Sequence, residues 1–185
     1  MTRITPEYQA LQEKFHVERP DYGMSGHRHV EPVLGFAKQL NTRDILDYGC
    51  GKASLQKGIP FPIQNYDPCY EEYKRRPEPA NMVICTDVLE HIEIDCLAEV
   101  LDDIASLTKQ ILFLNVSCVP AKKFLPDGRN AHIIQETPNW WLTWLLPRFT
   151  LQSFQANGGE FTALFTPLPP PSPCENTDGT APTEG

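Results

Sequence analysis

Residues 45–55 read ILDYGCGKASL, and this stretch decides the fold class. A short apolar run ends at Asp47, and small residues then follow at every second position, at Gly49, Gly51 and Ala53. Residues without a large side chain let the backbone turn sharply and let a ligand approach main-chain N–H groups closely. A plain tight turn is the alternative, so the neighbouring segments decide between the two.

Strand and helix patterns alternate on both sides of this stretch. Runs of apolar residues predict strands over 44–49, 63–68, 82–86 and 110–117. Periodicity and capping residues predict helices over 6–18, 29–40, 69–76, 96–109 and 139–146, with a short helical start at 53–58. The Asn157-Gly158 pair predicts a closing β-hairpin over 149–168. The fold class is therefore α/β, with a mostly parallel sheet that binds ligands at the carboxyl ends of its strands.

Composition fits one globular domain and excludes several classes of partner. The chain has 185 residues, of which 41% are hydrophobic and 22% charged, as in ordinary soluble domains. No apolar run approaches the ~20 residues that cross a membrane, and the first residues lack the apolar core of a secretory signal. Six scattered cysteines without a C-x-x-C pair suit reduced thiols, so we expect a cytoplasmic protein. A net charge of −8 argues against binding of duplex nucleic acid.

The last segment of the chain differs in composition from the rest. Residues 167–185 contain six prolines and three acidic residues but no lysine or arginine. Such a segment cannot bury enough apolar surface to offset the entropy of ordering it. We therefore expect one folded domain over 1–166 and a disordered, acidic tail over 167–185.

A second acidic residue lies where a nucleoside would be recognised. Asp67 ends the second predicted strand, 20 residues after Asp47, and a carboxylate there can accept hydrogen bonds from both ribose hydroxyls. The segments LDYGCGKA (46–53), YDP (66–68) and ICTDVLEHI (84–92), in that order, resemble the class I S-adenosylmethionine-dependent methyltransferases. A nicotinamide dehydrogenase is the rival, but its third glycine would fall on Ser54.

The resemblance covers residues 23–165 and implies a Rossmann-like sheet, S-adenosylmethionine as methyl donor, and a donor site. That site is expected to contain Asp47, Gly49, Cys50, Gly51, Asp67, Pro68, Thr86 and Asp87. The chain departs from the family because residues 68–81 are too few for a helix, a third strand and an acidic adenine-contact loop. We therefore expect a shortened or missing third strand and an adenine held in another way. A catalytically inactive donor-binding module is the alternative function.

A possible metal site follows the third strand. Asp87, Glu90 and His91 form D-x-x-E-H, and His132 follows the next strand, so two carboxylates and two imidazoles could bind Mg²⁺ or Mn²⁺. The pattern resembles the E-x-x-E-H and later histidine of small-RNA 2′-O-methyltransferases, and the E-x-x-E-H of ubiquinone-pathway O-methyltransferases, with Asp87 in place of glutamate. It implies catalytic roles for Asp87, His91 and His132. If a helix begins near Asp87, positions 87, 90 and 91 share one face of it. The alternative is that Glu90 and His91 only cap or pack that helix.

Basic residues suggest the chemistry of the acceptor. Lys122, Lys123 and Arg129 lie in a loop expected beside the donor, where they could bind a phosphate or carboxylate; a solvated loop is the alternative. Residues 22–29 form either a lid over the donor or a connector. The three tryptophans are expected in the core, with Trp140 as a possible flank of the acceptor. We thus expect methyl transfer to a hydroxyl, in preference to an amine, of a small anionic or nucleotide-like acceptor.

Overall fold

The computed structural model describes residues 2–169 of the chain. The expected tail therefore lies outside the described residues from position 170 onward. Its predicted boundary is wrong by one residue, because Pro167 is the last residue of a strand and pairs with Phe149.

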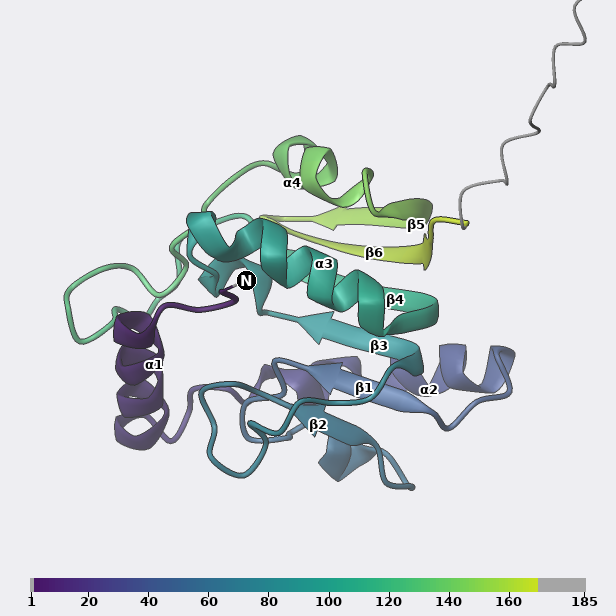
Figure 1. The fold of residues 1–185 in the computed structure, drawn as a ribbon, viewed down its shortest axis with the longest axis horizontal. Coiled ribbons are helices and arrows are strands. Elements are labelled where there is room, and N and C mark those ends of the chain that lie inside the picture. Colours follow the sequence, from purple (N-terminus) through teal and green to yellow (C-terminus); the bar gives the residue numbers. More distant parts are fainter. Residues whose placement is uncertain (1, 170–185) are drawn as a thin grey trace, which may run out of the picture.

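Six strands form one mixed sheet in the order β2-β1-β3-β4-β6-β5 (Figure 1). The strands are β1 (Ile45–Tyr48), β2 (Gln64–Tyr66), β3 (Ala80–Thr86), β4 (Thr108–Ser117), β5 (Phe149–Asn157) and β6 (Glu160–Pro167). The first four are parallel, and β6 runs antiparallel to both β4 and β5. The expected closing hairpin is confirmed. The described chain also has no strand between β2 and β3, as the short 68–81 segment predicted.

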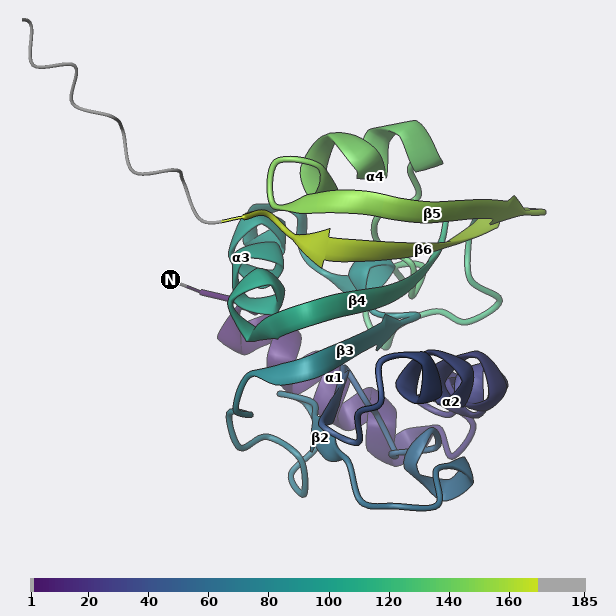
Figure 2. The ribbon, with the colours of Figure 1, turned by 90° about the vertical axis from the view of Figure 1, so that its right-hand side faces the viewer.

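Helices cover both faces of the sheet (Figure 2). Helices α3 (Leu97–Leu107) and α4 (Pro138–Leu145) pack on one face, against side chains such as Val83 and Leu114. Helix α2 (Val30–Gln39) covers the other face, where Ile84 and Phe113 point. Successive strand residues point to opposite faces, so continuous apolar runs in β3 and β4 serve both cores.

Helix α1 (Pro6–Glu18) lies at the carboxyl edge of the sheet instead of on a face (Figure 1). Thr5 caps it by accepting a hydrogen bond from the Tyr8 N–H, and proline occupies its first position. Its buried Tyr8 and Phe15 pack against Leu125 and Ala131 of the long loop after β4. This arrangement encloses the space above the strand ends.

The chain between β2 and β3 corrects one prediction. Residues 69–76 form turns and not a helix. The Asp67 carboxylate accepts a hydrogen bond from the Cys69 N–H, and the Asp67 N–H donates to the Tyr73 carbonyl, which closes a loop. In the sequence, Glu71 with Arg75 and Glu72 with Arg76 are spaced four apart and favour a helix, but each such pair contributes only about 0.2–0.5 kcal/mol.

Several short segments are 3₁₀-helical. They are η1 (Ser25–His29), η2 (Gln56–Gly58), η3 (Leu89–His91) and η4 (Ile94–Cys96). Segment η2 replaces the helical start expected at 53–58, and η1 shortens the helix expected from residue 29. Within residues 2–169, no helix combines the length and the apolar character needed to cross a bilayer.

Candidate functional site

The loop after β1 requires glycine at two positions, because its backbone is closely packed and has positive φ angles. Gly49 and Gly51 have φ values of +76° and +52°, which favour glycine. A side chain at Gly49 would clash with Val88, and a Cβ at Gly51 would lie 2.6 Å from the Gly23 carbonyl oxygen. The space beside both glycines is thus filled by the protein itself. Because Gly49 and Gly51 also line a cavity, ligand contact there uses the backbone.

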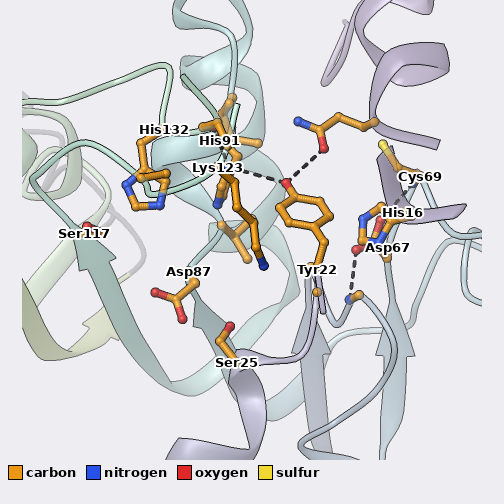
Figure 3. A pocket seen from close by; sticks show the side chains of 18 of the residues that line it. His16, Tyr22, Ser25, Asp67, Cys69, Asp87, His91, Ser117, Lys123 and His132 are labelled. Atoms are coloured by element: carbon orange, nitrogen blue, oxygen red, sulfur yellow. Dashed lines mark hydrogen bonds between the residues drawn. The ribbon is translucent and has the colours of Figure 1, made fainter. Parts of the chain in front are cut away.

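Asp67 holds this loop in place. Its Oδ2 accepts the Gly51 N–H at 2.9 Å and its Oδ1 accepts the Cys69 N–H at 2.9 Å. Burial raises the pKa of Asp67, and the nearby His16 imidazole opposes that shift. Figure 3 shows His16 beside Asp67. Asp47 at the end of β1 is also buried, and burial, followed by the charge of Asp67, raises its pKa to about 7.

A cavity of about 520 Å³ lies between α1 and the strand ends. This volume falls in the roughly 300–1,000 Å³ range of small-molecule sites. The sequence-predicted residues that line it are Gly49, Gly51, Asp67, Pro68, Asp87, His91, Lys122, Lys123 and His132. An adjoining hollow of about 30 Å³ is lined by Asp47, Gly49, Cys50, Thr86 and Asp87, among others. All eight residues expected at the donor site therefore line one of the two spaces.

Three of the four predicted metal ligands converge at one end of the cavity. One ligand atom from each of Glu90, His91 and His132 lies within 4.8 Å of the others. The rings of His91 and His132 meet edge to face with centroids 4.9 Å apart (Figure 3). The expectation of an α-helical face is wrong, since Glu90 and His91 belong to the short η3 turn.

Hydrogen bonds orient these three side chains. Nδ1 of His91 lies 2.7 Å from the Ala131 carbonyl, and Nδ1 of His132 lies 2.7 Å from the Val119 carbonyl. A carbonyl only accepts, so each Nδ1 carries the proton and each Nε2 keeps its lone pair, as in metal-binding histidines.

The third side chain of the cluster, Glu90, is fully buried. Its Oε1 accepts the Ser117 N–H at 2.9 Å, whereas its Oε2 has no hydrogen-bond partner among the described residues. Burial, followed by the charge of Asp87, raises the pKa of Glu90 to about 8. Burial, followed by the nearby His132, lowers the pKa of His91 to about 4, which keeps its ring neutral.

Asp87, the fourth predicted ligand, lies outside this cluster. Its Oδ2 accepts a hydrogen bond from Arg28 Nη2 at 2.8 Å, so Asp87 does not join the three clustered residues and its role as a ligand stays a prediction. Its φ of +54° is rare for a residue with a side chain, and such backbone strain concentrates at functional sites. Arg28 also lines the cavity, and the sequence patterns did not single it out.

The basic residues of the loop after β4 separate into two groups. Lys122 is exposed and lines the cavity, as does Lys123, whose Nζ lies 3.0 Å from Oδ2 of Asp21. Arg129 is not among the described residues that line the cavity, so its role in binding the acceptor stays a prediction. It pairs with Asp127 at 2.7 Å and lies over the Tyr8 ring.

The tryptophans are core residues. Trp141 is fully buried in α4, and Trp140 and Trp144 pack against the same cluster. Within residues 2–169, Trp140 does not line the cavity, so it does not flank an acceptor there.

The roof of the cavity is built from α1 and the loop after it, which sequence patterns left undecided. Tyr8 donates to the His91 carbonyl at 2.8 Å, Gln12 donates to the Tyr8 hydroxyl at 2.7 Å, and the Tyr22 hydroxyl donates to Gln12 at 2.9 Å. The Gly23 carbonyl accepts the Lys52 N–H at 2.9 Å. Residues 22–25 thus lie over the glycine loop, and the roof joins it to His91.

No family model matches the sequence, and no curated protein matches it significantly. Solved structures do resemble it. The 1,6-didemethyltoxoflavin-N1-methyltransferase of Burkholderia thailandensis, with bound S-adenosylhomocysteine, aligns over 87% of this chain and 89% of its own, with a TM-score of 0.60 and 15% identity. The magnesium protoporphyrin IX methyltransferase of Synechocystis, with bound S-adenosylmethionine, aligns over 77% and 79%, with a TM-score of 0.54 and 15% identity.

The methyltransferase domain of bacterial CtHen1 aligns over 77% of this chain and 99% of its own, with a TM-score of 0.53 and 15% identity. At identities this low, structural similarity supports a shared fold only, and the activity must be argued from the site. With the strand order and the closing hairpin described above, these matches lead to one conclusion. The chain has the fold of the class I S-adenosylmethionine-dependent methyltransferases, without a third strand in its described part.

Proposed function

We propose that this protein is an S-adenosylmethionine-dependent methyltransferase that methylates a hydroxyl group of a small, anionic acceptor. The observation that carries the proposal is a single cavity that contains both Asp67 with the glycine loop and the cluster of His91 and His132. Methyl transfer needs donor and acceptor held in line, and one cavity that spans both sites can hold them so.

The donor would lie against the strand ends. Each oxygen of Asp67 accepts one backbone N–H, and a carboxylate oxygen offers a second lone pair, so ribose hydroxyls can still bind. Asp47 and Asp87 line the hollow beside Gly49, where their carboxyl oxygens can accept hydrogen bonds from the donor's ammonium group. Pro68, Cys50 and Thr86 complete the walls.

The cluster of Glu90, His91 and His132 fits a divalent ion. A divalent cation would satisfy the buried Glu90 Oε2, which has no partner among the described residues, together with the two Nε2 lone pairs. Two imidazoles and one carboxylate suit Mn²⁺ better than Mg²⁺, which prefers oxygen ligands. When bound, such an ion supplies Lewis acidity that makes an acceptor hydroxyl easier to deprotonate. Ser117, Ala131 and Val119 keep the three side chains oriented.

The acceptor is recognised by charge. Lys122 and Lys123 project from the loop that also carries His132, so an anionic group on the acceptor would place its hydroxyl near the cluster. A hydroxyl is favoured over an amine because the cluster assists loss of a hydroxyl proton. The same fold also serves nitrogen acceptors, as the name of the toxoflavin enzyme indicates. An inactive donor-binding module is the second candidate, favoured by the absence of a third strand from the described part of the sheet.

The test is methyl transfer from labelled S-adenosylmethionine to a pool of anionic alcohols and phenols, with Mn²⁺ or with a chelator. We expect turnover that Mn²⁺ supports and chelation abolishes, while S-adenosylhomocysteine affinity stays nearly unchanged. Glu90→Gln and His132→Ala should behave like chelation. Glu136→Gln, an exposed carboxylate change outside the cavity lining, is the control. Donor binding without turnover on any acceptor would favour the inactive module.

A further inference from the structure

The hydrogen bonds of the cavity roof form a directed chain that ends on His91. The Tyr22 hydroxyl donates to Oε1 of Gln12 at 2.9 Å, and Nε2 of Gln12 donates to the Tyr8 hydroxyl at 2.7 Å. The Tyr8 hydroxyl in turn donates to the His91 carbonyl at 2.8 Å. Each group donates to the next, and hydrogen bonds arranged in this way strengthen one another. The chain therefore connects helix α1, and the loop after it, to the η3 turn.

The first member of this chain, Tyr22, also contacts the side chain of His91. The two rings meet edge to face with centroids 5.8 Å apart, and the Tyr22 hydroxyl oxygen lies 3.5 Å from Nδ1 of His91 (Figure 3). Because the Tyr22 hydroxyl gives its proton to Gln12, its oxygen can present a lone pair to Nδ1. This agrees with the tautomer that the Ala131 carbonyl requires, in which Nδ1 carries the proton and Nε2 keeps its lone pair.

The direction of the chain is set by Gln12. This side chain belongs to α1 and is only 5% exposed, yet both ends of its amide have a partner. An amide accepts at its oxygen and donates at its nitrogen, so it can connect two hydroxyls in a fixed order. A methionine of similar length would neither accept from Tyr22 nor donate to Tyr8. The order of the protons around His91 therefore depends on a residue that does not touch His91 itself.

We propose that Gln12 and Tyr8 are positioning residues for the histidine cluster, which hold His91 so that its Nε2 can bind a cation together with Glu90 and His132. The inference rests on the proposed cation site and deepens it. Tyr8 fixes the backbone carbonyl of His91, and Gln12 orients Tyr8 and Tyr22. Groups that orient metal-binding side chains in this way typically change the metal affinity ten- to hundredfold when they are removed.

The role assigned to Gln12 and Tyr8 goes beyond stabilising the fold. Neither side chain would touch the cation, since the residues whose ligand atoms converge are Glu90, His91 and His132. The loss of either positioning residue should therefore act on one ligand, the imidazole of His91. His132 is oriented separately, by the Val119 carbonyl, and should keep its place. A count of the imidazole nitrogens bound to the cation thus separates positioning from a general loss of stability.

The experiment is a titration of the full chain with Mn²⁺, followed by electron paramagnetic resonance. In protein that contains ¹⁵N-labelled histidine, pulsed measurements count the imidazole nitrogens bound to Mn²⁺. We expect two nitrogens in the native protein and one in Gln12→Met, whose dissociation constant for Mn²⁺ should rise roughly ten- to hundredfold. Tyr8→Phe should change both quantities in the same direction. Because the two side chains act through one chain, the double variant should bind Mn²⁺ about as well as the weaker single variant.

The matched control is Gln39→Met, which makes the same chemical change at an exposed position of α2 and should behave like the native protein. Melting curves show which variants fold, and Tyr8→Phe tests the inference by itself if Gln12→Met does not.

Three outcomes would contradict this reasoning, in distinguishable ways. If the native protein binds Mn²⁺ through two imidazoles and the folded variants do so with the same affinity, Gln12 and Tyr8 do not position His91, while the cation site stands. If the losses of affinity multiply in the double variant, the two residues do not act as one chain. If the native protein binds no Mn²⁺, the proposed cation site itself is wrong, and its positioning residues fall with it.

Discussion

Replacing Asp67 by asparagine separates the structural role of this side chain from its proposed role in donor binding. Both carboxylate oxygens accept backbone N–H groups, from Gly51 and Cys69. Asparagine keeps one acceptor oxygen and turns an amide N–H₂ toward the other N–H. One buried N–H then lacks a partner, which costs about 1–3 kcal/mol of unfolding free energy. Relief of the cost of burying a charge offsets part of this loss.

Donor binding should suffer more than folding. If a ribose hydroxyl donates to the Asp67 carboxylate, loss of that charge-assisted hydrogen bond removes about 1.5–3 kcal/mol of binding free energy. The dissociation constant of S-adenosylhomocysteine, measured by calorimetry at pH 7.5, should therefore rise roughly ten- to hundredfold. Urea unfolding gives the stability of the same variant, and Asp95→Asn serves as the control. Unchanged affinity together with lower stability would show that Asp67 only holds the loop.

Three further predictions follow from single positions. Gly51→Ala should lower the free energy of unfolding by about 1–3 kcal/mol in urea titrations, because Gly51 has a positive φ and the new Cβ would clash with the Gly23 carbonyl. Gly35→Ala, in α2, meets no neighbour and should raise the free energy of unfolding by about 0.5–1 kcal/mol. The pKa of Asp47 is raised from 3.8 to about 7 in the folded protein, so the folded state keeps a proton that the unfolded state loses. The free energy of unfolding should therefore fall as the pH rises from 4 to 7, and Asp47→Asn should reduce that fall. If the variant shows the same pH dependence of stability as the native protein, the raised pKa of Asp47 is refuted. Lys122→Ala should raise the acceptor KM several-fold while Arg129→Ala leaves it unchanged, and equal effects would contradict the placement of Arg129 outside the cavity.

Local sequence patterns were sufficient for the sheet. Each of these patterns involves only a few neighbouring residues. The apolar runs predict β1, β3 and β4, the Asn157-Gly158 turn predicts the hairpin, and the short 68–81 segment predicts the missing third strand. The helix expected at 69–76 failed because Asp67 and Tyr73 closed a turn instead. Charge spacing carries too little free energy to decide such a case.

The sequence predicted which side chains of the candidate site come together when those side chains follow neighbouring strands. Glu90, His91 and His132 converge because β3 and β4 are parallel and end at the same edge. Asp87 stands apart from this cluster because Arg28, distant in sequence, donates a hydrogen bond to its carboxylate. His16 was missed because helix α1, at the sheet edge, brings it to Asp67 through contacts that no local pattern reveals.

In the proposed function, one cavity holds both the methyl donor and the histidine cluster. Crystals grown with S-adenosylhomocysteine and Mn²⁺ test this directly through anomalous diffraction at the manganese edge. We expect one manganese peak about 2.0–2.3 Å from Glu90 Oε2, His91 Nε2 and His132 Nε2, with the ribose of S-adenosylhomocysteine on Asp67 in the same cavity. An empty cluster at saturating Mn²⁺, or S-adenosylhomocysteine bound away from Asp67, would contradict the account.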